Sequence, residues 1–385
     1  MKKLIQFGAG NIGRGFIAQL FTESGYEVVF VDINEILVNE LNKNKGYVLE
    51  IVGNKNRKVN IKNVRAVNGR DIKAISNEIL TADIMATSVG VNIIKNICPT
   101  IAEGIKVRAE NNIKSPLNII ICENLLHAGK IMKGYIETVL DKKYLSYLNQ
   151  YTGFVETVIG RMIPVVPKEI REKDPLYIMA EEFSILPVAK KGFVGLIPTI
   201  KNMIACDNFE SYEERKLFIH NLGHAICAYL GYLKGYDYIW QSIGDKDIRK
   251  IVQGALNETG ASIIKKHNLI KKEVDDYIDD LLDRFSNKSL GDTVYRVGRD
   301  PVRKLGPNDR LIGSARLVME NGIKPENIST GIAAALHYDY KEDEQAVRLA
   351  ELIKSQGPLA VLLSISKLKE DDDLTKIIIS KYRRL

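Results

Sequence analysis

The sequence is poor in cysteine and has no long apolar run. Its four cysteines lie far apart, with no CxxC pair or Cys/His cluster among them: Cys98, Cys122, Cys206 and Cys227. This spacing argues against a structural or catalytic zinc site, and free cysteines are typical of a reducing compartment. No stretch approaches the ~18 uninterrupted apolar residues of a membrane helix. We therefore expect a cytoplasmic protein that does not associate with membranes.

The chain also lacks a strong excess of either charge. Its 385 residues carry 55 basic and 48 acidic side chains, a net charge of +7. That excess suits an anionic small molecule but does not indicate a nucleic-acid partner. A length of this order corresponds to two domains, at roughly 100–200 residues each.

The first half of the chain alternates short apolar runs with segments of helical length. The runs expected as strands are Leu4–Phe7, Glu27–Val31, Asp83–Ser88, Asn118–Cys122 and Phe154–Ile159. This alternation is typical of an α/β fold whose parallel sheet has helices on both faces. Tyr47–Val52 and Lys58–Val64 flank a Gly/Asn/Lys turn and predict an inserted hairpin, and Leu176–Pro187 predicts a further extended segment.

Long helical patterns dominate the second half. They cover Tyr212–Leu233, Asp247–Lys266, Lys271–Phe285, Glu326–His337 and Gln345–Ser355. Between them, Leu290–Arg316 is rich in Gly, Pro and Arg and predicts an ordered loop. The character of the sequence changes near Gly192–Pro198.

A glycine motif follows the first expected strand and opens a helical pattern. Leu4–Phe7 runs directly into Gly8-Ala9-Gly10-Asn11-Ile12-Gly13. In a dinucleotide-binding turn, the first glycine permits the tight turn and the second lets the backbone approach the pyrophosphate. The third allows the helix to pack closely on the strand. The N–H groups at the helix start, around Asn11 and Ile12, then face the phosphates.

Asp32 ends the second expected strand, about 20 residues after the last glycine, as the dinucleotide-binding pattern requires. A carboxylate there bonds the adenosine ribose 2′-OH and repels a 2′-phosphate, and no basic residue follows directly, so we expect NAD. Two alternatives stay open: glycines that merely pack a tight turn, and FAD. The fold expected is α/β, with a Rossmann-type NAD-binding domain over residues 1–195. A mainly α-helical substrate and catalytic domain is expected over residues 196–385.

One helical segment in the second half gathers three residues suited to dehydrogenase chemistry. Ser211-Tyr212-Glu213-Glu214 predicts a capping box at its start. Lys216, Asn221 and His224 follow and fall within an arc of about 140° on an α-helix. A desolvated lysine can serve as a base, an asparagine NH₂ can stabilise an oxyanion, and a histidine can bind a hydroxyl. The alternative is a surface lysine beside two core side chains, and composition alone does not decide between them.

The sequence resembles the polyol-specific long-chain dehydrogenases over most of its length. The resemblance rests on four motifs: Phe7–Gly15, Cys122-Glu123-Asn124, the K-x4-N-x2-H signature that begins at Lys216, and Tyr295–Leu305. It implies a zinc-independent enzyme in which Lys216 is the general base, Asn221 and Asn124 form the oxyanion hole, and His224 binds substrate. Glu213 then matches an acidic residue near the proton exit. One departure is Gly160, where an acidic residue is expected before Arg161; Glu156 is a possible substitute, and that role is left unassigned.

The arginine-rich stretch indicates a phosphorylated substrate. Arg296 and Lys304 match family positions that contact the polyol, and Arg299 and Arg303 are the cations expected to grip a phosphate. For Arg310 and Arg316, bracing through carboxylates is an equally good interpretation.

Three functional hypotheses follow. The first is the reversible NAD-dependent oxidation of D-mannitol 1-phosphate to D-fructose 6-phosphate. The second keeps the chemistry but uses an unphosphorylated polyol or a hexuronate. The third is a non-catalytic NAD-binding regulator, which would need none of the three helix residues. The partners expected are a small sugar phosphate, no nucleic acid, no membrane and no metal, with a monomer or weak homo-oligomer as the assembly.

Overall fold

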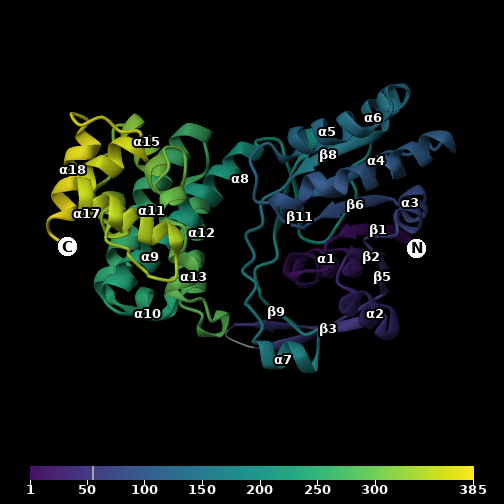
Figure 1. The fold of residues 1–385 in the computed structure, drawn as a ribbon, viewed down its shortest axis with the longest axis horizontal. Coiled ribbons are helices and arrows are strands. Elements are labelled where there is room, and N and C mark those ends of the chain that lie inside the picture. The colour runs from purple at the N-terminus through teal and green to yellow at the C-terminus, as the bar shows by residue number, and fades with distance from the viewer. Residues whose placement is uncertain (54–55) are drawn as a thin grey trace. The chain divides into compact units, whose positions relative to one another are not determined.

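The structure, a computed structural model, describes residues 1–53 and 56–385. The chain divides into two compact units, Met1–Phe209 and Glu210–Leu385, which Figure 1 colours from purple to yellow. The segment after residue 195 contains β11 (Met203–Cys206), which pairs in parallel with β10 (Leu186–Ala189). Its contacts therefore keep this segment in the first unit.

A six-stranded parallel sheet forms the centre of the first unit, in the order β5-β2-β1-β6-β7-β8. The strands are β1 (Lys2–Phe7), β2 (Tyr26–Asp32), β5 (Val64–Asn68), β6 (Ile84–Thr87), β7 (Leu117–Ile121) and β8 (Thr152–Glu156). Counted along the chain within this sheet, the order is the 3-2-1-4-5-6 of doubly wound folds, and it reverses between β1 and β6. The predicted α/β fold class is confirmed.

Helices cover both faces of this sheet because its strands are apolar on both sides. One face packs on α1 (Ala18–Glu23) and α2 (Glu35–Asn44). The other packs on α3 (Ile72–Leu80), α4 (Ile94–Glu110) and α5 (Ala128–Val139), which lie along one side of the sheet in Figure 1. Shorter elements complete the unit: η2 (Val91–Ile93), η3 (Lys142–Tyr144), α6 (Leu145–Tyr151), α7 (Lys168–Lys173) and η4 (Lys190–Gly192).

The predicted hairpin is confirmed as β3 (Gly46–Val52) and β4 (Arg57–Lys62), which pair antiparallel. Its predicted turn falls partly on residues 54–55, which lie outside the described residues. The expectation that the second arm runs to Val64 is wrong. Asn63 adopts φ +58°, which turns the chain and starts the separate strand β5. β9 (Ile178–Glu181) joins the hairpin beside β3.

The second unit is helical, as expected, and packs around one central helix. α9 (Asn221–Leu233) is buried along nearly its whole length, which explains why its apolar residues form no single stripe. Around it lie α10 (Ile239–Gly244), α11 (Lys246–His267), α12 (Lys271–Phe285), η6 (Lys288–Leu290), α16 (Glu326–Leu336), α17 (Glu344–Ser364) and α18 (Asp373–Tyr382).

The predicted loop Leu290–Arg316 is mostly short helices, so that expectation is wrong in its detail. The helices are α13 (Val294–Gly298), α14 (Pro301–Lys304) and the start of α15 (Ile312–Glu320). Local capping explains them: Thr293 Oγ1 accepts from Arg296 N at 3.1 Å, and Asp300 accepts from Arg303 N with Pro301 as the first helical residue.

Two further observations concern the whole chain. All four cysteines are free and buried, and burial raises the pKa of Cys98 to about 12. Within residues 1–53 and 56–385, no helix is long and apolar enough to cross a membrane.

Candidate active site

The glycine turn lies at the carboxyl end of β1, where the strand order of the sheet reverses. Gly8 has φ +91°, and a Cβ there would lie 2.5 Å from the carbonyl oxygen of Ser88, just past β6. A Cβ on Gly13 would lie 2.2 Å from the Gly8 carbonyl oxygen. A Cβ on Gly10, by contrast, would meet no heavy atom of the described residues within 4 Å. The backbone at Gly10 is therefore open to a close approach by a phosphate.

The chain enters its first helix directly after this turn. Asn11 is exposed and Ile12 half-buried, and a π-helical turn, Gly13–Ile17, continues into α1. The first N–H groups of a helix have no acceptor within it, so these residues are placed to donate to an anion.

Asp32 stands at the end of the neighbouring strand β2. Its Oδ2 accepts from Ala9 N at 2.7 Å and its Oδ1 from Asn34 N at 2.8 Å. Each oxygen keeps a second lone pair that a ribose hydroxyl can use. The carboxylate therefore braces the glycine turn and remains able to bind a ligand.

Two arginines near this turn were missed by sequence reasoning. Arg70 follows β5, and Gly69 N donates to the Asp32 carbonyl oxygen at 2.8 Å; the Arg70 guanidinium pairs with Glu35 at 3.3 Å and is exposed. Arg14 is buried, and its Nε donates to the Ala9 carbonyl oxygen at 2.6 Å. Burial lowers the pKa of Arg14. The arginine directly after the last glycine was the available signal for Arg14, whereas Arg70 lies beyond a strand that the pattern did not separate.

Asn124 lies in the loop after β7 and is exposed. The preceding residue, Glu123, is buried and accepts from Val89 N at 2.8 Å and from Gly90 N at 2.9 Å. Burial raises the pKa of Glu123, although these two bonds oppose the shift. Glu123 thus ties the loop after β6 to the loop after β7, which fixes the backbone that carries Asn124.

The unassigned acidic role near Arg161 gains a structural account. Glu156 Oε1 accepts from Gly129 N at 3.1 Å, at the start of α5. Arg161 is buried, with Nη1 donating to Gln19 Oε1 at 2.7 Å and Nε to the Glu181 carbonyl oxygen at 2.8 Å. Glu156 therefore serves a helix start rather than Arg161.

The K-x4-N signature of the second unit spans a π-helical turn, not a continuous α-helix. α8 (Phe209–Arg215) is followed by the π turn Lys216–His220 and then by α9. Asn221 N bonds the Lys216 carbonyl oxygen, the i to i−5 pattern of a π turn. This stacks the two side chains, with Lys216 Nζ 3.4 Å from Asn221 Oδ1. The α-helical arc expected from the sequence is corrected by this extra residue in the turn.

Lys216 is electrostatically unusual. The residue is half-buried as a whole, but its ammonium group is desolvated, and this burial together with Arg310 and Arg284 lowers its pKa to about 8. An ammonium group only donates, so Asn221 presents Oδ1 to Lys216 and keeps its NH₂ for another acceptor. A lysine near neutrality beside a free amide donor is the arrangement that proton transfer to or from an alkoxide requires.

His224 lies one turn further along α9 and is tied to an aspartate that sequence reasoning missed. Its Nε2 is 3.1 Å from Asp292 Oδ2, and its ring stacks on Phe285 with 4.8 Å between centroids. Asp292 also pairs with Arg296 through its other oxygen. His220 is buried beside His224. The acidic residue just before the capping threonine of α13 was the only signal for Asp292.

The cations of the arginine-rich stretch differ in their partners. Arg303 donates to Asp300 at 2.8 Å and to Asp309 at 3.0 Å, and Arg310 donates to Asp309 at 2.8 Å. Arg299 is exposed and has no carboxylate within ion-pair distance among the described residues.

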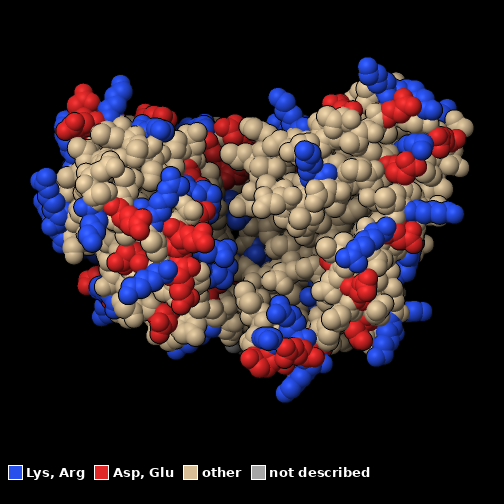
Figure 2. Space-filling model, in the orientation of Figure 1, with Lys and Arg blue, Asp and Glu red and all other residues tan. Residues whose placement is uncertain are grey.

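Lys304 and Arg316 complete this set. Lys304 is buried and donates to the Arg299 carbonyl oxygen. Burial, with Arg310 and Arg303 nearby, lowers its pKa to about 7. Arg316 donates to the carbonyl oxygens of Pro307 and Lys367, which is a bracing role. On the face drawn in Figure 2, basic and acidic side chains are interspersed over the second unit.

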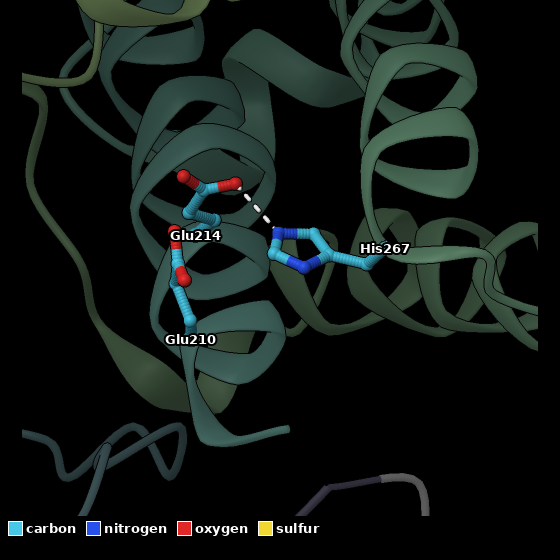
Figure 3. Close-up of side chains that lie close together, drawn as sticks. All are labelled: Glu210, Glu214 and His267. Atoms are coloured by element: carbon cyan, nitrogen blue, oxygen red, sulfur yellow. Dashed lines mark hydrogen bonds and ion pairs between the residues drawn. The ribbon is translucent and has the colours of Figure 1, made fainter.

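The predicted capping box is wrong, because α8 begins at Phe209 and Ser211 lies inside the helix. Glu213 is half-buried in α8, before Lys216. Glu214 turns to α11, with Oε2 2.8 Å from His267 Nε2, as Figure 3 shows. Glu210, Glu214 and His267 have ligand atoms close enough for a metal ion. Lys266 Nζ already bonds both carboxylates, so the group is an ion-pair network and we assign no metal to it.

Comparison with known proteins places this chain among sugar-alcohol dehydrogenases. The model of the mannitol dehydrogenase Rossmann domain matches residues 2–202, and that of the mannitol dehydrogenase C-terminal domain matches residues 208–385. The chain belongs to the mannitol dehydrogenase family.

Named relatives and solved structures extend this result. A mannitol-1-phosphate 5-dehydrogenase of Thermoanaerobacter pseudethanolicus is 42% identical over 385 residues, covering 100% of this chain and 98% of the relative. One of Buchnera aphidicola is 40% identical over 381 residues, covering 99% and 98%. Among solved structures, a D-sorbitol dehydrogenase has TM-score 0.82 at 17% identity, covering 99% of this chain and 92% of that one. The Pseudomonas fluorescens mannitol 2-dehydrogenase complex with NAD and D-mannitol has TM-score 0.76 at 16% identity, covering 100% and 92%. These two structures support the fold.

Proposed function

We propose that this chain is an NAD-dependent oxidoreductase that interconverts D-mannitol 1-phosphate and D-fructose 6-phosphate without a metal ion. The observation that carries the proposal is Lys216, whose pKa is lowered to about 8 and whose ammonium lies 3.4 Å from Asn221 Oδ1. The named relatives, at about 40% identity over nearly their whole length, support the substrate.

The first unit fits a dinucleotide, which supplies the hydride acceptor for the alcohol or the hydride donor for the ketone. The open backbone at Gly10 and the helix start at Asn11, Ile12 and Gly13 suit a pyrophosphate. Asp32 suits the adenosine ribose. A non-catalytic NAD-binding regulator would need this half alone, and the desolvated Lys216 argues against it.

The second unit supplies the proton. In polyol oxidation, the neutral amine of Lys216 takes the hydroxyl proton; in ketone reduction, its ammonium returns it. The Asn221 NH₂ donates to the developing alkoxide, and Asn124 is the second donor that the family resemblance implies. Glu213, also from the resemblance, lies on the route by which the proton leaves.

We assign the substrate phosphate to Arg299 and Arg303, and the polyol hydroxyls to Arg296, Lys304 and His224. Arg299 is the better phosphate ligand because its charge is not shared with a carboxylate, whereas Asp300 and Asp309 hold Arg303. A guanidinium binds phosphate bidentately, which a lysine does not.

The test is NADH oxidation with fructose 6-phosphate beside fructose, tagaturonate and fructuronate, each with and without EDTA. We expect turnover with fructose 6-phosphate alone and no loss in EDTA. Equal turnover of fructose or a hexuronate would replace the phosphate assignment with the unphosphorylated alternative. Activity lost in EDTA and restored by zinc would contradict the lysine mechanism.

We also propose a cytoplasmic monomer or weak homo-oligomer. Light scattering coupled to size-exclusion chromatography, over a range of protein concentrations, tests the assembly. A stable tetramer at the lowest concentration would contradict it.

A further inference from the structure

One buried carboxylate contacts two residues of the candidate substrate site at once. Asp292 is 8% exposed. Its Oδ2 lies 3.1 Å from His224 Nε2, and its Oδ1 pairs with Arg296 Nη2. These two partners come from different helices, α9 and α13, so a single side chain sets the position of one relative to the other.

The backbone around Asp292 is fixed on both sides. Gly291 adopts φ +58°, which turns the chain after η6. Ile239 N donates to the Asp292 carbonyl oxygen at 2.9 Å, and Val294 N donates to the Asp237 carbonyl oxygen at 2.8 Å. The carboxylate is therefore held in place by backbone bonds that do not involve His224 or Arg296.

The ring of His224 has little freedom either. It stacks on Phe285 at an interplanar angle of 17° and meets the His220 ring edge to face. With the ring plane set by Phe285, its Nε2 edge faces the carboxylate. The pKa of His224 is lowered by burial, which Asp292 opposes only in part, and the pKa of Asp292 stays low despite its burial because of His224 and Arg296.

We propose that Asp292 is a positioning residue that fixes the tautomer of His224 and holds the Arg296 guanidinium beside it. A carboxylate only accepts hydrogen bonds, so the nitrogen that faces it carries the proton. His224 then has its proton on Nε2, and Nδ1 is an acceptor for a substrate hydroxyl. Arg296, held on the other oxygen, donates only. The pair thus offers one acceptor and one donor, which is what two hydroxyl groups of a polyol require.

The variant Asp292→Asn tests the tautomer directly. Arg296 can only donate, so the amide oxygen of the variant turns to Arg296 and its NH₂ turns to His224. Nε2 must then accept, and the proton moves to Nδ1. Nitrogen-15 NMR of histidine-labelled protein distinguishes the two tautomers, and loss of one signal in His224→Gln identifies His224. We expect Nε2–H in the natural protein and Nδ1–H in Asp292→Asn.

This measurement needs no substrate, so it stands even if the proposed function fails. A proton on Nδ1 of His224 in the natural protein overturns the proposal without any variant, which covers the case in which Asp292→Asn does not fold. An unchanged tautomer in a folded Asp292→Asn overturns it as well.

The kinetic arm rests on the proposed function. Asp292→Asn should raise the KM for fructose 6-phosphate by about 10–100-fold, the effect of losing hydrogen bonds to a charged group. The KM for NADH should change less than about twofold and kcat less than the sugar KM, because substrate binding and not proton transfer is affected. The matched control is Asp247→Asn, which removes an exposed carboxylate of α11. Equal losses in kcat and in both KM values would indicate a merely structural role and contradict the proposal.

Discussion

Two partly buried cations, one in each unit, show how differently the protein treats positive charge. Arg65 of the first unit shares three bonds with Glu27 and Glu78, all between 2.7 and 2.8 Å, and its pKa is raised by them. Lys216 of the second unit has an amide oxygen as its partner and two arginines as electrostatic neighbours. The first arrangement holds a charge permanently, whereas the second makes a charge easy to lose, which is what proton transfer requires.

The largest expected effect is on catalysis when the second cation is removed. Lys216→Met should lower turnover by about 10²–10⁴-fold, since it removes the general acid and base, and should raise the melting temperature because a desolvated charge disappears. Arg65→Met should do the reverse, because it leaves Glu27 and Glu78 without their partner. Steady-state kinetics and thermal unfolding of both variants test the contrast. Near-normal turnover in Lys216→Met would end the mechanism.

The second effect concerns substrate affinity. Arg299→Ala should raise the KM for fructose 6-phosphate by about 10–100-fold, as expected for a lost hydrogen bond to a charged group, with the KM for NADH unchanged. Arg303→Ala should also raise it sharply, but it frees Asp300 and Asp309 and so should lower the melting temperature too. A substrate KM that neither variant changes would place the phosphate elsewhere.

A comparable effect is expected for the cofactor. Asp32→Ala should weaken NAD binding by about 10–100-fold, and since Ala9 N loses its acceptor, some loss of stability should accompany it. Fluorescence titration with NADH and NADPH measures both affinities. Equal turnover of the two cofactors by the natural protein would show that Asp32 does not select against a 2′-phosphate.

The next effect is a shift in pH dependence. With a Lys216 pKa of about 8, polyol oxidation should rise as pH passes through about 8, because the neutral amine is the base, and ketone reduction should fall there. Arg310→Met removes a like charge, so the pKa of Lys216 rises and both midpoints should move to higher pH by about one unit, equivalent to about 1.4 kcal/mol. Arg249→Met, which removes an exposed cation of α11, should leave both midpoints in place.

The smallest effect is structural and belongs to the compensated cation. The bond from Arg65 lowers the pKa of Glu78 to about 2 from 4.5. A depressed carboxylate stabilises the fold above its unfolded pKa and loses that contribution as pH falls toward its folded pKa. The stability difference between the natural protein and Glu78→Gln should therefore be full at neutral pH and vanish between pH 4.5 and 2. Urea unfolding at several pH values checks this.

The two halves also differ in how much the sequence predicts. In the first unit, the strand, the glycines and Asp32 are local signals, and the order of the parallel strands follows from them. The break at Asn63 was missed because a positive φ at one asparagine leaves no periodic trace.

In the second unit, Lys216, Asn221 and His224 were found through the family signature, and the structure puts Lys216 beside Asn221. The π turn was beyond reach, because one extra residue in a turn does not disturb the apolar pattern of a helix buried on all sides. The sharing of Asp300 and Asp309 between Arg303 and Arg310, and the contact of Asp292 with His224, depend on side-chain positions that spacing does not encode.

The burial of every cysteine has a practical consequence for work on this protein. A thiol reacts as the thiolate, and burial raises the pKa of Cys98, Cys122 and Cys227. Maleimide and disulfide reagents should therefore leave the folded chain unmodified at neutral pH. A single cysteine introduced on an exposed residue of each unit would then carry a fluorophore or spin label with no native background, and no native cysteine would have to be replaced to follow how the units move during turnover.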